Sequence, residues 1–285
     1  DRVQRSSEWA VEQIYMAHFA LTDVDEGKFY AYERFERGAA GLAGARGEPY
    51  YEVWLRDWQV EQTGPDTYRL QASQDAASLD LELVNQKGIT LQGEQGYSQK
   101  GPEPGNASLY YSQTRLESHG NLTLGQQEFH VTGLSWLDRE ISTSALSPGQ
   151  TGWDWFALQL NDGSELMVYT LRRTDGSIDE FSTGTFINPD GQTILLARDD
   201  FLLTSDVVWR SPHSGAAYPA QWTIEVPELG LSLNVRPLLN DQELNLSFRY
   251  WEGAVEFDGF RGGKPVSGFG YVELTGYAQS MEGEF

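Results

Sequence analysis

Cysteine is absent from the 285 residues, and basic residues are few. Without cysteine the chain has no disulfides, no thiolate metal ligands and no cysteine nucleophile. It has 20 Lys and Arg residues against 42 Asp and Glu residues, which gives a formal charge of −22 at pH 7. Nucleic-acid binding and docking on anionic lipid both need a basic surface. The charge therefore argues against nucleic acid as a partner and against electrostatic attachment to a membrane.

Long apolar runs and sustained helical periodicity are also missing. No run of 18 apolar residues occurs, so the sequence predicts no transmembrane segment. The start, Asp1-Arg-Val-Gln-Arg5, has no apolar core behind it and is not a signal peptide; a signal peptide removed before residue 1 is compatible with it. The histidines are scattered without metal-ligand spacing, so we expect no metal and no other cofactor.

Short apolar segments separated by turn residues are what the chain does contain. Asn161-Asp-Gly163, Asp175-Gly176 and Asn188-Pro-Asp-Gly191 are turns of the hairpin type. Short strands at regular spacing predict an all-β protein with two antiparallel barrels of about eight strands each, and such a barrel can hold one small ligand. The polar segment 142–150 is the predicted linker, which gives domains at 1–145 and 146–285. Single strands are expected at 53–60, 109–116, 120–124, 178–187 and 193–203.

One stretch, Val131 to Asp138, alternates like a strand and carries the first candidate site. Alternation places Trp136, Asp138 and Glu140 on one face, and an apolar wall raises the pKa of a neighbouring acid. Val266 to Glu273 matches this stretch position by position. The match aligns Trp136 with Tyr271 and Asp138 with Glu273, which suggests that two similar domains end in the same closing strand.

Asp138 can be read in two ways. As a carboxyl with a raised pKa beside Trp136, it can protonate carbon during addition of water to an alkene. As a structural group, it closes an ion pair with a neighbouring arginine. Asp138 and Glu140 also lie about 7 Å apart by strand rise, a separation that suits an inverting glycosidase.

Other residues form a wider set of candidates. Asp154 stands between Trp153 and Trp155, so a strand places the acid on one face and the two indoles on the other. With Asp138 and Trp136 it is predicted to be catalytic, and a surface acid beside core packing is the alternative. Glu252 and Glu273 are expected to face a barrel lumen, as ligand contacts or as satisfied structural groups. Tyr110, Trp251, Tyr271 and His18 complete the set assigned to ligand binding, and a satisfied core role is the alternative for His18.

Several motifs together resemble one protein family. They are Gln13-Ile-Tyr-Met-Ala-His-Phe-Ala-Leu-Thr-Asp23, Lys100-Gly-Pro-Glu-Pro-Gly105, Ser135-Trp-Leu-Asp-Arg-Glu140, Gly152-Trp-Asp-Trp155, Asp241-Gln-Glu-Leu244, Tyr250-Trp-Glu-Gly253 and Gly270-Tyr-Val-Glu-Leu-Thr-Gly-Tyr277. They resemble the AttH-like branch of the carotenoid hydratase (CrtC) family over about Ile14 to Tyr277. The resemblance implies two lipocalin-like barrels packed together in a periplasmic or secreted protein of the bacterial envelope, and it implies association with an envelope transporter. The founding branch hydrates a carbon–carbon double bond, and more distant fungal relatives are pericyclases.

Two departures from the family pattern bear on the site. The family opens with a Glu-Trp-Trp-Tyr strand upstream of the Tyr-Met-Ala-His segment, so the first barrel is expected to lack its opening strands here. The hydratase branch carries its acid in a tyrosine-containing motif, where this chain has Trp136-Leu-Asp138. Asp138 corresponds to the acid, and this motif supplies no tyrosine.

Two functions follow as hypotheses. The first is a binding protein for an apolar or amphipathic small molecule of the cell envelope. The alternative is a hydratase- or isomerase-type lyase on an isoprenoid or polyene, with Asp138 as general acid and Trp136, Trp153 and Trp155 as walls. A carbohydrate enzyme is the third possibility.

Overall fold

The computed structural model describes residues 13–142 and 146–281, and strands dominate both ranges. Within them the chain has two short 3₁₀-helices and no α-helix, as expected from the missing helical periodicity. The strand pairings are antiparallel. The prediction of an all-β antiparallel fold is therefore confirmed. The described residues contain no helix that is long and apolar enough to cross a membrane.

Two compact units divide the chain, and neither is continuous in sequence. Of the described residues, the first unit comprises those up to Leu21, Tyr30–Gly88 and Arg115–Ser135. The second comprises Thr22–Phe29, Ile89–Thr114 and the described residues from Trp136 onward. This division differs from the predicted boundary after residue 145. It differs because two long strands, β10 and β11, each contribute residues to both units.

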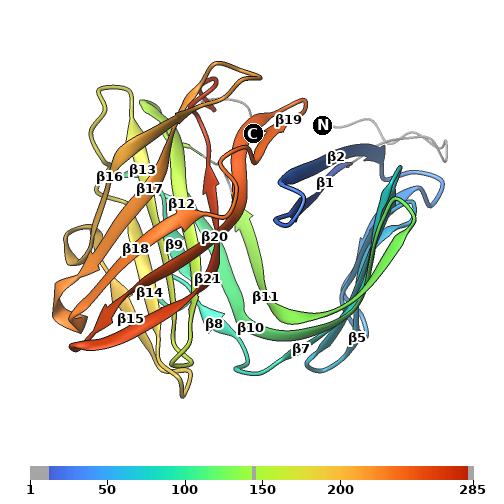
Figure 1. The fold of residues 1–285 in the computed structure, drawn as a ribbon, viewed down its shortest axis with the longest axis horizontal. Helices are drawn as coiled ribbons and strands as arrows, with labels where there is room; N and C mark the ends of the chain where they lie inside the picture. Colours follow the sequence, from blue (N-terminus) through green and yellow to red (C-terminus); the bar gives the residue numbers. More distant parts are fainter. Residues whose placement is uncertain (1–12, 143–145, 282–285) are drawn as a thin grey trace. The chain divides into compact units, whose positions relative to one another are not determined.

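The first sheet has nine strands in the order β11-β10-β7-β6-β5-β4-β3, and β8 and β9 pair with β10 (Figure 1). Its strands are β3 (Ala43–Arg46), β4 (Glu52–Leu55), β5 (Trp58–Gly64), β6 (Thr67–Gln74), β7 (Ala77–Asn85), β8 (Thr90–Leu91), β9 (Tyr97–Gln99), β10 (Ala107–Leu124) and β11 (Gln127–Ser142). A separate hairpin consists of β1 (Ile14–Asp23) and β2 (Lys28–Arg37). Phe19 from this hairpin packs with Trp58, Ala72 and Ala77 in a small core of the first unit.

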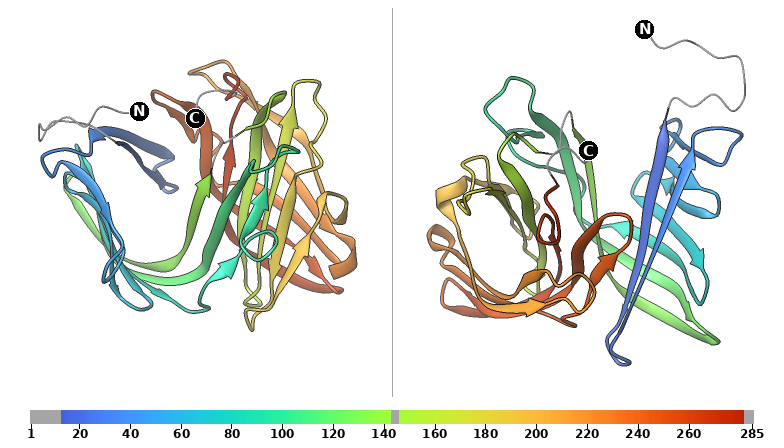
Figure 2. Two further views of the ribbon diagram at one scale, coloured as in Figure 1. Left: turned by 180° about the vertical axis from the view of Figure 1, so that it is seen from behind. Right: turned by 90° about the horizontal axis from the view of Figure 1, so that it is seen from above.

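The second sheet has ten strands in the order β15-β14-β13-β12-β21-β20-β18-β17-β16, with β19 paired to β20. Figure 2 shows its strands curling round a common interior. They are β12 (Gln150–Leu160), β13 (Glu165–Arg173), β14 (Thr183–Ile187), β15 (Thr193–Leu196), β16 (Leu202–Arg210), β17 (Ala217–Val226), β18 (Leu231–Pro237), β19 (Glu243–Asn245), β20 (Arg249–Arg261) and β21 (Lys264–Leu274). The 3₁₀-helices are η1 (Arg198–Asp200) and η2 (Pro227–Leu229).

Large apolar side chains fill the interior of the second sheet. Three alternate residues of β12, Phe156, Leu158 and Leu160, belong to this core. Phe156 and Trp251 both pack against Trp222, with ring centroids 5.5 and 6.2 Å away. The barrel interior that was expected to hold a ligand is therefore occupied by the protein's own side chains.

Strand boundaries differ from the predicted ones where a turn or a glycine was misread. The strand expected at 53–60 is two strands, β4 and β5, joined by a turn at Arg56 with φ of 57°. The strands expected at 109–116 and 120–124 are one strand, β10. Residues 193–203 contain β15, η1 and the start of β16, and only 183–187 of the strand expected at 178–187 form β14.

Candidate active site

The carboxyl of Asp138 accepts three side-chain hydrogen bonds within the second unit. Strand alternation on β11 places Trp136 and Asp138 on one face, as predicted, and Trp136 Nε1 donates to Asp138 Oδ1 at 2.8 Å. From β10, the hydroxyl of Tyr110 donates to Oδ2 at 2.9 Å and that of Ser112 donates to Oδ1. These three donors fix the orientation of the carboxyl group.

The environment of Asp138 raises its pKa. Part of the Asp138 residue is in contact with solvent, but many protein atoms lie close around its carboxyl group. Burial raises the pKa to about 6, against the opposing effect of the hydrogen bonds from Ser112, Trp136 and Tyr110. No arginine pairs with Asp138 in the described part of the chain, so the alternative of a structural ion pair does not apply to it.

Aromatic side chains and a buried lysine surround this carboxyl. Trp155 Nε1 donates to the Tyr110 hydroxyl at 3.1 Å, and the rings of Trp136 and Trp155 meet edge to face with centroids 6.5 Å apart. Tyr110 thus brings a phenol hydroxyl from β10 to the carboxyl of Asp138, whose own motif contains no tyrosine. Trp153 and Trp155 belong with Tyr110 to one apolar cluster.

Lys100 is a neighbour that the sequence analysis did not assign to the site. Its ammonium lies 3.0 Å from Glu140 Oε1, and 4.0 and 5.5 Å from the ring centres of Tyr169 and Tyr110. Its membership of the Lys100–Gly105 motif was the signal that pointed to it. Since Glu140 is engaged by this lysine, Glu140 is not a free partner for Asp138 as the glycosidase hypothesis requires.

Two glutamates form the second titratable group of the site. Glu252 on β20 and Glu273 on β21 are direct cross-strand partners, and Trp155 is the partner of Glu273 on β12. All three lie on the face of the sheet opposite the apolar core, because the residues flanking the two glutamates (Trp251, Val272 and Leu274) are core residues. The prediction that the glutamates face the barrel lumen is therefore wrong.

Burial raises the pKa of both glutamates. For Glu273, the charge of Glu252 raises it further, and those of Glu140 and Asp138 add smaller effects. Two adjacent carboxyls cannot both ionise easily, so the pair retains a proton at a pH where an isolated glutamate has lost it. Asp138 and Glu273, the two acids that the sequence match aligned, thus interact through their charges.

Three other predicted residues lie elsewhere in the fold or serve its packing, and a fourth, Tyr271, lies beside Glu273. Asp154 is on the core face of β12, where it pairs with Arg172 at 2.9 Å and accepts from Tyr277 at 3.0 Å. Trp251 is 2% exposed and belongs to the core of the second sheet. His18 is in the first unit, 3.1 Å from Glu33. Tyr271 is the cross-strand partner of Ala157 and lies on the face of Glu273.

The carboxyl-rich character of the site does not make it a metal centre. Across residues 13–142 and 146–281, no group of three or more His, Cys, Asp or Glu side chains is arranged to hold a metal ion. The groups that the site does offer are proton donors and acceptors.

Comparison with known proteins identifies the family. A family profile described as AttH-like matches residues 1–277. The chain belongs to the AttH-like family. A crystal structure of an AttH from Nitrosomonas europaea, described as putative, is 36% identical, with a TM-score of 0.85 over 95% of this chain and 84% of that one. The family prediction is therefore confirmed.

More distant relatives of this AttH-like chain are hydratases and dehydratases. The kievitone hydratase of Fusarium solani subsp. phaseoli is 25% identical over half of this chain and 40% of its own length. Dehydratase asqC of Emericella nidulans is 24% identical over 73% of this chain and 61% of its own length. The matches thus span less than two thirds of both curated relatives. The solved kievitone hydratase of Nectria haematococca shares the fold, with a TM-score of 0.73 over 93% of this chain and 80% of that one at 17% identity.

Proposed function

We propose that this AttH-like protein is a lyase of the hydratase or dehydratase type. The observation that carries the proposal is the carboxyl of Asp138, oriented by three donors and with its pKa raised by burial. The names of its hydratase and dehydratase relatives support the same reaction class. A general acid or base needs a pKa near the working pH, and burial provides it here.

The two acidic groups suit the two proton transfers of such a reaction. In dehydration, the Asp138 carboxylate takes a proton from carbon, and the C–H electrons form the double bond. The C–O bond breaks, and the leaving hydroxyl takes a proton from the Glu252–Glu273 pair to form water. Hydration is the reverse. Among the described residues only the Tyr110 hydroxyl donates to Asp138 Oδ2, so a lone pair on this oxygen remains for the substrate proton. When two acids have different pKa values, the one with the lower pKa serves as the base and the one with the higher pKa as the acid. Here these are Asp138 and the Glu252–Glu273 pair.

The substrate class follows from the walls of the site. Trp136 and Trp155 offer indole surface beside the carboxyl, and both pack against the buried cluster of Tyr110 and Tyr169. Aromatic walls suit an apolar or conjugated substrate and stabilise positive charge that develops on it. We therefore propose an alkene or a hydroxylated precursor of one, such as an isoprenoid-like chain.

The binding-protein hypothesis receives no comparable support. The lumen that was predicted to hold the ligand is filled by Phe156, Trp222 and the rest of the core. None of the relatives named above is a binding protein by description. The envelope location, the apolar ligand and the transporter association stay predictions.

Incorporation of labelled water tests the lyase. The protein is incubated in ¹⁸O-labelled water with prenylated phenols, acyclic isoprenoid alkenes and β-hydroxy ketones, and products are analysed by mass spectrometry. We expect one substrate class to gain or lose one water. Asp138→Asn should lower kcat by about 10²–10⁴-fold, whereas the exposed turn variant Asp25→Asn should match the wild type. Turnover by Asp138→Asn at the wild-type rate would exclude the proposed role of this residue.

A further inference from the structure

Gln92 is a buried glutamine that uses only one end of its side-chain amide. The residue is 0% exposed and directly follows β8. Its Nε2 donates to the hydroxyl of Ser112 at 2.8 Å, whereas its Oε1 has no hydrogen-bond partner among the described residues. A buried amide with one end unpaired costs stability, because the unpaired atom has lost its hydration. The position of this glutamine therefore needs an explanation other than stability.

Gln242 is buried to the same degree and uses both ends of its amide. Its Nε2 donates to the carbonyl oxygens of Leu239 and Ala254 at 2.8 and 3.2 Å, and its Oε1 accepts from the Ala254 N–H at 2.9 Å. These contacts hold backbone in place. The side chain of Gln92 bonds to no backbone group in the described part of the chain, so it has no comparable structural task.

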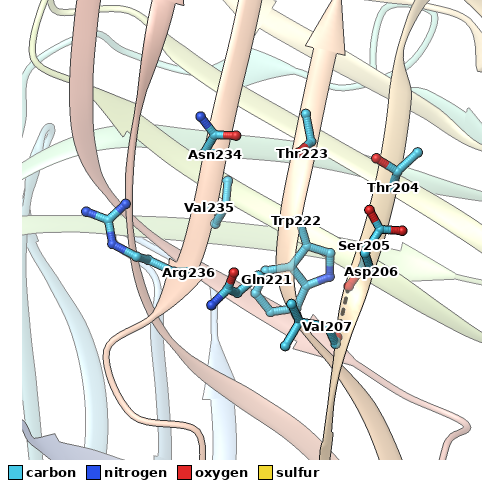
Figure 3. Close-up of a pocket in the computed structure, with 10 residues that line it drawn as sticks. All are labelled: Thr204, Ser205, Asp206, Val207, Gln221, Trp222, Thr223, Asn234, Val235 and Arg236. Atoms are coloured by element: carbon cyan, nitrogen blue, oxygen red, sulfur yellow. Dashed lines mark hydrogen bonds between the residues drawn. The ribbon is translucent and has the colours of Figure 1, made fainter.

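An unpaired polar atom does not by itself indicate a function. Trp222 Nε1 is also buried and has no hydrogen-bond partner among the described residues. Its ring packs against Phe156 and Trp251 in the core, and Figure 3 shows it among the residues of β16, β17 and β18 that line a cavity. No hydrogen bond leads from this side chain to the proposed site. Gln92 differs, because its hydrogen bond does lead there.

Ser112 connects Gln92 with the carboxyl of Asp138. The serine is 0% exposed, and its hydroxyl donates to Asp138 Oδ1. A hydroxyl group has one proton and two lone pairs. Because Gln92 donates to the serine oxygen, the single hydroxyl proton is directed to Asp138. The amide, the hydroxyl and the carboxyl thus form a chain in which each hydrogen bond polarises and strengthens the next.

The backbone fixes the place of Gln92 in this chain. Thr90 on β8 is the register partner of Ser112 on β10, and the Gln92 N–H donates to the carbonyl oxygen of Tyr110 at 3.0 Å. Alternation along the strands therefore puts the side chains of Gln92, Ser112 and Tyr110 on one face. The chain turns at Gly93 with φ of 63°, where a Cβ would collide with the backbone of β9.

We propose that Gln92 is a positioning residue of the lyase, which directs the hydroxyl proton of Ser112 onto the carboxyl of Asp138. The inference rests on the proposed function, in which Asp138 transfers the proton. Burial raises the pKa of Asp138, and the hydrogen bond from Ser112 opposes this rise. Without Gln92 the hydroxyl is free to rotate and is a weaker donor, so the protonated form of Asp138 becomes more favourable.

Other titratable groups near Asp138 are not hydrogen-bonded to the side chain of Gln92 in the described part of the chain. They are Tyr110 on β10, Glu140 on β11, Glu273 on β21 and Lys100, which pairs with Glu140. A substitution at residue 92 leaves these groups in place. A change in the pKa of Asp138 then reports the hydrogen bonds through Ser112.

Gln92→Met tests the proposal in a ¹³C-carboxyl titration followed by NMR. The pKa of Asp138 should rise by about 0.2–0.5, because the Ser112 hydroxyl loses its polarising donor. The melting temperature should stay within about 2 °C of the wild type, since an apolar side chain of similar length replaces a half-paired amide. An Asp138 pKa equal to that of the wild type overturns the proposal.

Gln242→Met is the matched control, because it makes the same change at an equally buried glutamine. It should lower the melting temperature by about 4–8 °C, since it leaves backbone groups unpaired. The pKa of Asp138 should be unmoved. A rise in this pKa equal to that in Gln92→Met would show a general effect of core disturbance and would overturn the proposal.

Ser112→Ala tests the route of the effect. With the hydroxyl removed, adding Gln92→Met should cause no further change in the pKa of Asp138. A rise of the same size with and without Ser112 would overturn the assigned chain of hydrogen bonds.

The side-chain amide resonance of Gln92 gives a test in the wild-type protein, which does not depend on a variant at residue 92. It should titrate with the midpoint of the Asp138 carboxyl, and the titration should vanish in Asp138→Asn. A Gln92 resonance that does not follow the ionisation of Asp138 overturns the proposal.

These titrations need no substrate, so they separate this inference from the proposed function. Once a substrate is known, the pH profile of kcat/KM should move to higher pH in Gln92→Met by the same amount as the pKa of Asp138. A pH profile that stays in place would overturn the positioning role. Absence of turnover together with the expected titrations would count against the lyase and not against the chain of hydrogen bonds.

Discussion

Asp138 and Asp154 show how neighbours decide what an aspartate does in this protein. Both lie beside tryptophans in sequence, and burial raises the pKa of both carboxyls. Asp154 faces the core and has the Arg172 guanidinium beside it, whereas Asp138 has only uncharged donors. Pairing with a fixed charge suits a structural role, and uncharged donors leave a carboxyl able to exchange its proton.

Tyr110→Phe tests the hydrogen bond that holds Asp138. The tyrosine hydroxyl stabilises the ionised carboxyl, so its removal should raise the pKa of Asp138 further. A ¹³C-carboxyl titration monitored by NMR measures the shift directly. Tyr271→Phe serves as the control, because Tyr271 lies on the face of β21 that carries Glu273 and its hydroxyl is not hydrogen-bonded to Asp138. An unchanged Asp138 pKa in Tyr110→Phe would contradict the hydrogen bond.

Asp154→Asn tests the structural ion pair. The change leaves the Arg172 guanidinium partly buried without its carboxylate. We therefore expect the free energy of unfolding, measured in urea, to fall by about 3 kcal/mol. Asp258→Asn breaks an exposed pair with Arg236 and should cost less than about 1 kcal/mol. An equal loss of unfolding free energy in the two variants would show that the Asp154–Arg172 ion pair stabilises the fold no more than an exposed pair does.

The local part of the site could be predicted from sequence, and the distant part could not. Trp136 and Asp138 are two residues apart, so strand alternation alone places them together. Tyr110 and Lys100 reach the same carboxyl neighbourhood from 28 and 38 residues upstream of Asp138. The positions of Tyr110 and Lys100 beside Asp138 depend on the register of β9, β10 and β11, and no local sequence pattern specifies that register.

At the scale of elements, Gly120 keeps β10 continuous. The sequence analysis took this glycine for the start of a new strand, but the strand passes through it with φ of 151°. A Cβ at this position would collide with the carbonyl oxygen of Asp80 on β7. Glycine in a strand therefore marks a close backbone approach here and not an end.

Gly120→Ala should destabilise the first unit. Both the positive φ and the collision with Asp80 oppose an alanine, and we expect a loss of about 1–3 kcal/mol in the free energy of unfolding. Gly133→Ala on β11 meets no atom within 4 Å and has no positive φ, so it should be nearly neutral. Thermal unfolding of both variants at one pH makes the comparison. A neutral Gly120→Ala would show that β10 can adjust at this point.

The cross-strand pair of Glu252 and Glu273 links two elements through their charges. Like charges directly opposite each other destabilise a sheet, and the cost appears only when both are ionised. Glu273→Gln should therefore raise the melting temperature by about 1–3 °C at pH 8 and by less at pH 5. Glu256→Gln, which removes a carboxylate paired with Arg236, should show no such gain at pH 8. The same gain at both pH values would rule out charge repulsion as its cause.

For the whole molecule, acidic groups of two kinds set the pH range of greatest stability. The pKa of Asp57, Asp80 and Asp162 is lowered, chiefly through hydrogen bonds and arginines (for Asp162 against burial, the largest single effect). The stability that these groups contribute is present above their unfolded pKa, near about 4, and is lost as the pH falls below it. Asp138, Glu252 and Glu273 change the stability with pH in the opposite direction, because folding raises their pKa.

The melting temperature should therefore fall as the pH rises from about 5 to 8. A group with a raised folded pKa contributes its full stability below the unfolded pKa, about 4, and loses it as the pH passes through the folded pKa, which is about 6 for Asp138. The formal charge of −22 acts in the same direction through repulsion, so the series is measured by calorimetry at high salt, where surface charges are screened. The double variant Asp138→Asn, Glu273→Gln should show a flatter decline than the wild type. A wild-type melting temperature that rises between pH 5 and 8 at high salt would mean that these carboxyls are not held in the protonated form by the fold.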